Sequence, residues 1–133
     1  MFTKEDLYVI DKLPVFKELY PDTDAAVSRY AELYELYAEK FTAPESFYMF
    51  SAPGRTEIGG NHTDHNHGCV LAGSVNLDSA AIVVPTNDDT VNIYSVGYQR
   101  PFKVNIKNTK PVESEKETTV ALVRGIAARF KEL

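Results

Sequence analysis

Residues 51–68 read SAPGRTEIGGNHTDHNHG, and this stretch separates two apolar runs of the chain. The run at 47–50 precedes it, the run at 70–75 follows it, and residues 76–79 separate the latter from a third run at 80–84. Short apolar runs bounded by proline and glycine are typical of strands. The sequence therefore predicts two strands joined by a polar, glycine-rich loop, which is a common setting for a binding site.

Helical periodicity precedes these strands. Large apolar and aromatic residues recur at three- and four-residue steps from Val27 to Phe41, which predicts an amphipathic helix. Its tyrosines are expected to pack on a core rather than to stack on a ligand. Pro44 ends the pattern, because proline cannot continue a helix. The candidates for the N-cap of this helix are Asp22, Thr23 and Asp24.

Further strands and a second helix follow. Residues 91–96 form an apolar run after a turn, and residues 102–106 alternate between apolar and polar side chains. Apolar residues from Val120 to Leu133 predict a helix with one face on the core. The order of helix, about five strands and helix predicts an α+β fold with a mixed, largely antiparallel sheet and flanking helices.

The composition excludes several classes of protein. The 133 residues suffice for one domain, and 44% hydrophobic residues suffice for a packed core. Fourteen Lys and Arg against nineteen Asp and Glu argue against a nucleic-acid partner. No apolar stretch reaches the length of about eighteen residues that a membrane span needs, and no signal peptide is recognisable. Cys69, the single cysteine, cannot form an internal disulfide, which favours a cytoplasmic protein.

Two kinds of site are weighed first for the polar stretch. Gly54 and Gly59 have the gap of a Walker-type phosphate loop, but the Lys-Ser or Lys-Thr that must follow is missing, which excludes that loop. A zinc or iron site is an alternative, since His62, Asp64, His65 and His67 lie within six residues and are all competent ligands. However, neighbouring loop residues point in divergent directions, so a metal would need a further ligand from elsewhere.

Recognition of a polyhydroxylated ligand fits the residue types better. Asp64 offers two acceptor oxygens, while Asn61 and His62 offer both donors and acceptors. Arg55 offers a planar cationic fork, which could also offset negative charge beside a phosphate donor. The stretch therefore predicts a small-molecule sugar as the ligand.

These residues also resemble a known family. The segments 52–55 (APGR) and 60–64 (GNHTD), together with Asn66 and Gly68, are similar to the signature of galactokinases of the GHMP kinase superfamily. The resemblance covers roughly residues 45–130. It implies that the chain is a single, incomplete N-terminal sugar-binding domain of a GHMP-type kinase, with part of the fold of ribosomal protein S5 domain 2.

The resemblance also implies a reaction and residue roles. Galactokinases transfer the γ-phosphoryl group of ATP, with Mg²⁺, to the anomeric hydroxyl of a hexose, here expected to be galactose. Arg55 matches the catalytic arginine that stabilises the transition state. Asp64 matches the aspartate that holds sugar hydroxyls, and His62 matches a histidine near the far end of the sugar. Asn61 and Thr63 complete the expected substrate-binding residues.

The signature of this chain departs from the family pattern at three places, and two further motifs are missing. Asn61 replaces a glutamate, His65 replaces a tyrosine, and residues 56–59 (TEIG) replace Val-Asn-Leu-Ile. Residues 108–133 contain neither the family's Gly-Ser-Ser-Ser-Ala-type phosphate loop nor its catalytic aspartate. We therefore expect this chain to supply the sugar-binding half of the enzyme, to bind neither ATP nor Mg²⁺ tightly, and to lack activity alone.

Two further expectations concern the chain as a whole. The final helix runs to Leu133 without a stop signal, which is typical of a truncated fold. Such a fold exposes a sheet edge, so we expect self-association through that edge. The alternative function is a non-catalytic module that binds a sugar or a partner chain.

Overall fold

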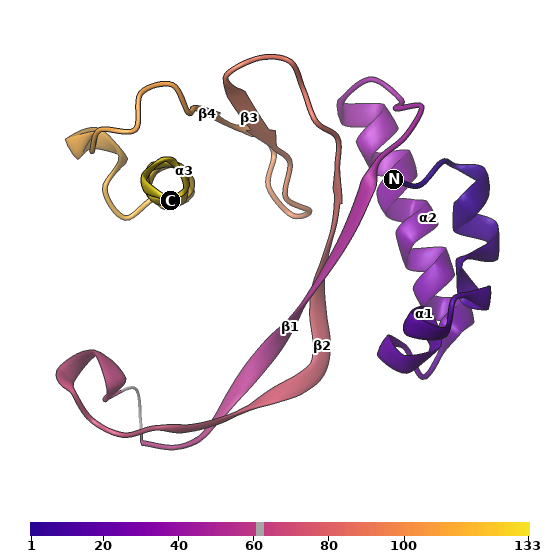
Figure 1. The fold of residues 1–133 in the computed structure, drawn as a ribbon, viewed down its shortest axis with the longest axis horizontal. Coiled ribbons are helices and arrows are strands. Elements are labelled where there is room, and N and C mark those ends of the chain that lie inside the picture. The colour runs from indigo at the N-terminus through magenta and orange to yellow at the C-terminus, as the bar shows by residue number, and fades with distance from the viewer. Residues whose placement is uncertain (61–62) are drawn as a thin grey trace. The chain divides into compact units, whose positions relative to one another are not determined.

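The computed structural model describes residues 1–60 and 63–133, except for the side chain of Asp64. The chain forms two compact units, Met1–Val84 and Pro85–Leu133 (Figure 1). The described elements of the first unit are η1 (Glu5–Lys12), α1 (Pro14–Leu19), α2 (Thr23–Lys40), β1 (Tyr48–Gly59), η2 (Asp64–Asn66) and β2 (Leu71–Val83). Those of the second unit are β3 (Thr90–Ile93), β4 (Phe102–Asn105), η3 (Glu113–Glu115) and α3 (Thr119–Glu132).

Helix α2 confirms the predicted first helix and its cap. The side chain of Asp22 accepts a hydrogen bond from the backbone nitrogen of Ala25 at 3.0 Å, which satisfies one free donor of the first turn. The helix ends at Lys40, just before Pro44. Its buried residues Tyr30 and Tyr34 face the core, as expected for tyrosines that pack rather than stack on a ligand.

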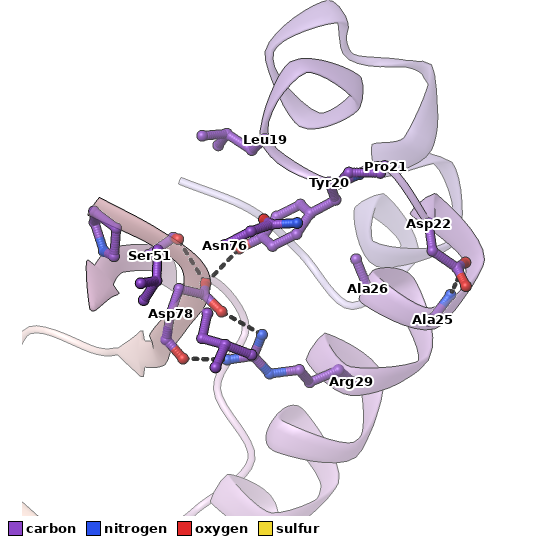
Figure 2. A pocket seen from close by; sticks show the side chains of 13 residues that line it. Leu19, Tyr20, Pro21, Asp22, Ala25, Ala26, Arg29, Ser51, Asn76 and Asp78 are labelled. Carbon is purple, nitrogen blue, oxygen red and sulfur yellow. Dashed lines mark hydrogen bonds and ion pairs between the residues drawn. The ribbon is translucent and has the colours of Figure 1, made fainter. Parts of the chain in front are cut away.

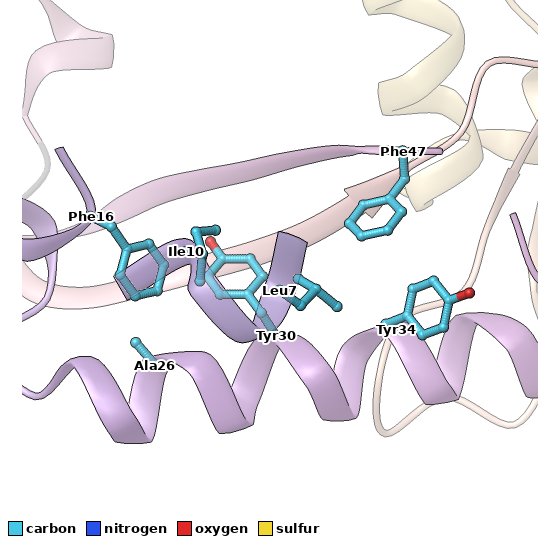
Figure 3. Packing of buried hydrophobic residues seen from close by; sticks show 7 residues of the cluster. All are labelled: Leu7, Ile10, Phe16, Ala26, Tyr30, Tyr34 and Phe47. Carbon is cyan, nitrogen blue, oxygen red and sulfur yellow. The ribbon is translucent and has the colours of Figure 1, made fainter. Parts of the chain in front are cut away.

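The core of the first unit lies between its helices and the start of β1 (Figure 3). Seven hydrophobic residues are buried in this cluster: Leu7, Ile10, Phe16, Ala26, Tyr30, Tyr34 and Phe47. Phe47 is fully buried, and its ring centroid lies 5.4 Å from that of Tyr34. The backbone of Phe47 also exchanges two hydrogen bonds with Phe2, of 2.7 and 2.9 Å, which ties the N-terminus to the start of the hairpin.

Strands β1 and β2 form one long antiparallel hairpin. The register runs from Tyr48 opposite Val83 to Pro53 opposite Asp78, and then shifts before Arg55 pairs with Ser74. One residue of β1 therefore faces three of β2 at this bulge, residues 75–77. The bulge keeps β2 continuous where the sequence predicted a break.

The α+β class and the antiparallel pairing are confirmed, but the expected number of strands is wrong. The described residues form two separate sheets of two strands each, β1–β2 and β3–β4, instead of one sheet of about five. The runs at 70–75 and 80–84 merge into β2, because residues 76–79 are accommodated within the strand by the bulge. The loop within the polar stretch 51–68 is also shorter than expected, because β1 extends to Gly59.

The second unit is organised around a buried arginine. Arg124 of α3, 8% exposed, donates from Nε and Nη2 to the two carboxylate oxygens of Glu115, at 2.7 Å each. Its Nη1 donates to the carbonyl oxygens of Asn105 and Asn108, at 3.0 and 2.5 Å. The two hydrogen bonds from Arg124 to Glu115 lower the pKa of the Glu115 carboxyl. The arginine thereby fixes the segment between β4 and α3.

The apolar face predicted for the last helix is only partly covered: Val120, Val123 and Ala127 are half-buried, whereas Ile126 is exposed. Phe130 is 73% exposed and Leu133 is 84% exposed, and Arg124 is the buried residue of α3 among the described residues. The periodicity located the helix correctly, but periodicity alone does not say that a partner surface is present.

None of the helices within 1–60 and 63–133 is long and apolar enough to cross a membrane.

Candidate functional site

The tip of the β1–β2 hairpin is built around Thr63. Its backbone nitrogen and its Oγ1 donate to the carbonyl oxygen of Gly60, at 3.2 and 2.8 Å. Its own carbonyl oxygen accepts from the nitrogens of Asn66 and Gly68, at 3.0 and 2.7 Å. The expected ligand-binding residue Thr63 therefore has a fixed position, with its hydroxyl proton directed to the backbone.

Two glycines of the signature are required by this geometry. Gly60 has a φ of +106°, and a Cβ there would lie 2.5 Å from the carbonyl oxygen of Cys69. A Cβ at Gly68 would lie 2.3 Å from Oγ1 of Thr63. Between them, His67 adopts the left-handed conformation with a φ of 61°. Gly60 and Gly68 of the signature therefore serve the close packing of the tip.

Arg55 is exposed and lies on β1, opposite Ser74, rather than on a loop. Within the described part of the chain its guanidinium has no hydrogen-bond or ion-pair partner. It therefore presents its fork of donors to solvent. Thr63 belongs to the same hairpin, at its tip, so the hairpin carries both residues.

The remaining candidates cannot be placed in full. Asn61 and His62 lie outside the described residues, and only the backbone of Asp64 is described, at the start of the short helix η2. The convergence of Arg55, His62 and Asp64 on one small molecule therefore stays a prediction. In the described residues, no group of three or more His, Cys, Asp or Glu side chains could hold a metal ion.

A polar cluster that the sequence analysis missed lies at the bulge of the hairpin (Figure 2). Oδ2 of Asp78 accepts from the hydroxyls of Tyr20 and Ser51, at 2.8 and 2.6 Å. Nη1 of Arg29 donates to Oδ1 of Asp78 at 2.5 Å, and Nη2 donates to its backbone oxygen at 3.1 Å. Figure 2 shows these side chains converging from α2, from the segment before it and from both strands. We call Asp78, Tyr20, Arg29 and Ser51 the Asp78 cluster.

The electrostatics of this cluster follow from its hydrogen bonds. Partial burial raises the pKa of the Asp78 carboxyl, but the hydrogen bonds from Ser51, Arg29 and Tyr20 outweigh this effect and lower it to about 2. Burial, together with the hydrogen bond to Tyr20, raises the pKa of the Tyr30 hydroxyl well above its ordinary value. Asp78 is therefore anionic and paired with a cation at neutral pH.

The Asp78 cluster borders an open hollow of about 500 Å³. The apolar part of its wall is formed by Leu19, Pro21, Ala25, Ala26, Pro53, Val75 and Leu77. Of the three charged residues on the wall, Arg29 and Asp78 bond to each other, and Asp22 is the N-cap of α2. No sequence signal pointed to this cluster, because its members are far apart in the chain and belong to different predicted elements.

Known proteins share sequence similarity with the segment that forms the hairpin. Residues 35–85 match the galactokinase galactose-binding signature. The matched segment runs from the end of α2 through the hairpin and its tip. Over this segment, the chain is similar to the galactokinases. This confirms the resemblance inferred from the APGR and GNHTD segments.

Individual relatives show how much of the family is represented. A galactokinase of Candida parapsilosis is 34% identical over 83 residues, which are 61% of this chain and 16% of that protein. A galactokinase of Limosilactobacillus reuteri is 29% identical over 101 residues, 72% of this chain and 26% of that protein. A galactokinase of Bacillus subtilis is 35% identical over 68 residues, 51% of this chain and 17% of that protein. The chain thus spans about a quarter or less of the length of these relatives. No solved structure matches it.

Proposed function

We propose that this chain binds galactose at the tip of the β1–β2 hairpin, as the sugar-binding portion of a galactokinase. The observation that carries the proposal is the match of residues 35–85 to the galactose-binding signature. This segment supplies a long hairpin with one end on the helical core, and its glycines support a tightly bonded tip. A rigid scaffold with polar residues at its end suits recognition of a small ligand.

The roles of the site residues follow from their chemistry. Arg55 donates hydrogen bonds to the ligand from its exposed fork and offsets negative charge at the reacting end of the sugar. Asp64 accepts hydrogen bonds from sugar hydroxyls, and His62 and Asn61 each bond a further hydroxyl. Thr63 uses its hydroxyl proton within the tip, so its role toward the sugar is limited to accepting through Oγ1.

The complete reaction needs more than this chain supplies. In the proposed enzyme, ATP and Mg²⁺ provide the phosphoryl group and the cation that neutralises its charge, and the anomeric hydroxyl of the sugar accepts the group. Because residues 108–133 contain neither the phosphate loop nor the catalytic aspartate of the family pattern, we assign no residue of this chain to ATP or Mg²⁺ and expect the chain alone to be inactive. We also propose, from the composition, that the chain is a single domain in the cytoplasm. We propose that it has no nucleic-acid or membrane partner.

Isothermal titration calorimetry tests the proposed binding. D-galactose should bind the chain with a Kd in the millimolar range, and D-glucose and D-mannose should bind more weakly. Arg55→Ala should weaken galactose binding by about tenfold, because a charge-assisted hydrogen bond is lost. Arg100→Ala is the matched control, since Arg100 is also exposed but lies outside residues 35–85.

The outcomes separate this function from the alternatives. No heat with any hexose would overturn sugar binding and leave a partner-binding module. Equal losses in both arginine variants would contradict the assigned role of Arg55. Mg²⁺-dependent phosphorylation of a sugar by this chain would contradict the proposed lack of activity, and stoichiometric zinc or iron would revive the metal site. Light scattering over a range of concentrations tests self-association through the unpaired strand edges, which a monomer at every concentration would contradict.

A further inference from the structure

The β1–β2 hairpin has two halves with different support. In the base half, residues 48–53 pair with 78–83, and in the distal arm, residues 55–59 pair with 71–74. Of the two halves, the base half contributes Met49, Ala80 and Ile82 to the packing around the helical core. Figure 1 shows the hairpin running beside α2 and then bending away from it toward the tip.

The two halves meet at a point where the backbone ladder is weak. Pro53 has no N–H to donate to β2 at its pair with Asp78. The next residue, Gly54, faces the bulge, and a Cβ there would lie 3.1 Å from Cγ2 of Val75 and 3.2 Å from the carbonyl oxygen of Leu77. Because ladder bonds are disrupted at a bulge, the direction of the distal arm depends on what else fixes this junction.

The Asp78 cluster provides that fixation. Asp78 belongs to the base half and directly follows the bulge of β2 in the sequence. Its carboxylate accepts hydrogen bonds from three side chains. Tyr20 and Arg29 belong to the helical part of the unit, whereas Ser51 belongs to β1. The cluster therefore ties both strands of the hairpin to the helices immediately beside the change of register (Figure 2).

We propose that Asp78 is a positioning residue for sugar binding: its bonds to Tyr20, Arg29 and Ser51 set the direction in which the distal arm carries Arg55 and the Thr63 tip. This inference rests on the proposed function, because the group positioned is the proposed sugar site. Arg55 is the first paired residue of β1 beyond the bulge, so a change of direction at the junction moves it at once. The permanent charge of the Asp78 carboxylate at neutral pH makes these bonds charge-assisted and strong.

Four variants test the proposal by hydrogen exchange and calorimetry on the full chain. Asp78→Asn keeps the shape and removes the charge, and Ser51→Ala removes one donor from an exposed position. Asp6→Asn is the matched control, because Asp6 also accepts hydrogen bonds in the first unit, but only from Thr3 near the N-terminus. Asp78→Asn should speed exchange of the amides of residues 71–74 and raise the galactose Kd, each by about tenfold.

The pattern of changes decides between positioning and simple stabilisation. Ser51→Ala should give smaller changes in the same amides, and Ser51→Thr should restore both exchange and affinity. Asp6→Asn should change neither, whatever it does to the melting temperature. An unchanged Kd and unchanged exchange at 71–74 in Asp78→Asn would overturn the proposal. Equal acceleration of exchange over residues 71–74 and 80–83 would mean that Asp78 merely stabilises the unit, and this would also overturn the positioning proposal. If the wild-type chain binds no galactose, the proposed function fails, but the exchange data still report whether Asp78 fixes the distal arm.

Discussion

The first unit encloses a cluster of apolar and aromatic side chains, whereas the buried residue of α3 in the second unit is an arginine. Apolar burial is not directional, so the first unit can hold several helices and a strand pair on one cluster. The contacts of Arg124 are directional, and they fix carbonyl groups of one connecting segment. Residues of the same type should therefore contribute very differently to stability in the two units.

The largest expected effect comes from a pair of phenylalanines. Phe47→Ala should lower the free energy of unfolding of the first unit by about 3–5 kcal/mol, because Phe47 is fully buried and its loss leaves a cavity. Phe130→Ala should change the free energy by no more than about 0.5 kcal/mol, since Phe130 is largely exposed on α3. Urea denaturation followed by circular dichroism measures both. Equal losses would mean that the apolar face of α3 is covered in solution.

The next effect probes the arginine of the second unit. Arg124→Met keeps much of the side-chain volume but leaves Glu115 and the carbonyl oxygens of Asn105 and Asn108 without their donor. Amide exchange around η3 and the start of α3 should become about tenfold faster. Exchange within α2 should stay unchanged.

If Arg124→Met instead left η3 protected, the second unit would be held mainly by its apolar contacts. The contrast between the two units would then be lost, and Val104 would be the residue to truncate next, because it is the fully buried side chain of β4.

The smallest of these effects is a pH dependence in the first unit. The pKa of Asp78 is about 2 in the folded state, below its ordinary value of 3.8, so this carboxylate stabilises the fold above a pH of about 4. That contribution, about 1 kcal/mol because solvent screens the pair with the partly exposed Arg29, is lost as the pH falls from about 4 through about 2. Urea denaturation at a series of pH values should show this loss in wild type and a weaker dependence in Asp78→Asn. Parallel curves would show that Asp78 does not carry the effect.

The fold was predictable where local signals decide it. The cap Asp22 and the apolar spacing located α2, and the glycine-rich segment located the turn of the hairpin. The merger of two predicted strands into β2 depends on a bulge opposite Gly54, which is a contact across the sheet. The exposure of Phe130 depends on what packs against α3. Neither is encoded in the local sequence.

The candidate site shows the same limit. The residue types around Arg55 and Asp64 were enough to indicate a sugar ligand, and the galactose-binding signature agrees with that indication. The Asp78 cluster was not predictable, because Tyr20 and Asp78 are 58 residues apart and meet only in the folded chain. The pattern of residues 76–79 is typical of a connection between two strands, and it does not indicate a structural role for the carboxylate of Asp78.

The tip of the hairpin also carries the chain's single cysteine, Cys69, which is exposed. Its backbone oxygen lies against Gly60, so the thiol is attached to the tightly bonded part of the turn. A maleimide fluorophore or a nitroxide spin label can therefore be placed beside the proposed ligand site without any change to the natural sequence. Such a label would turn the arrival of a sugar into an optical or magnetic signal.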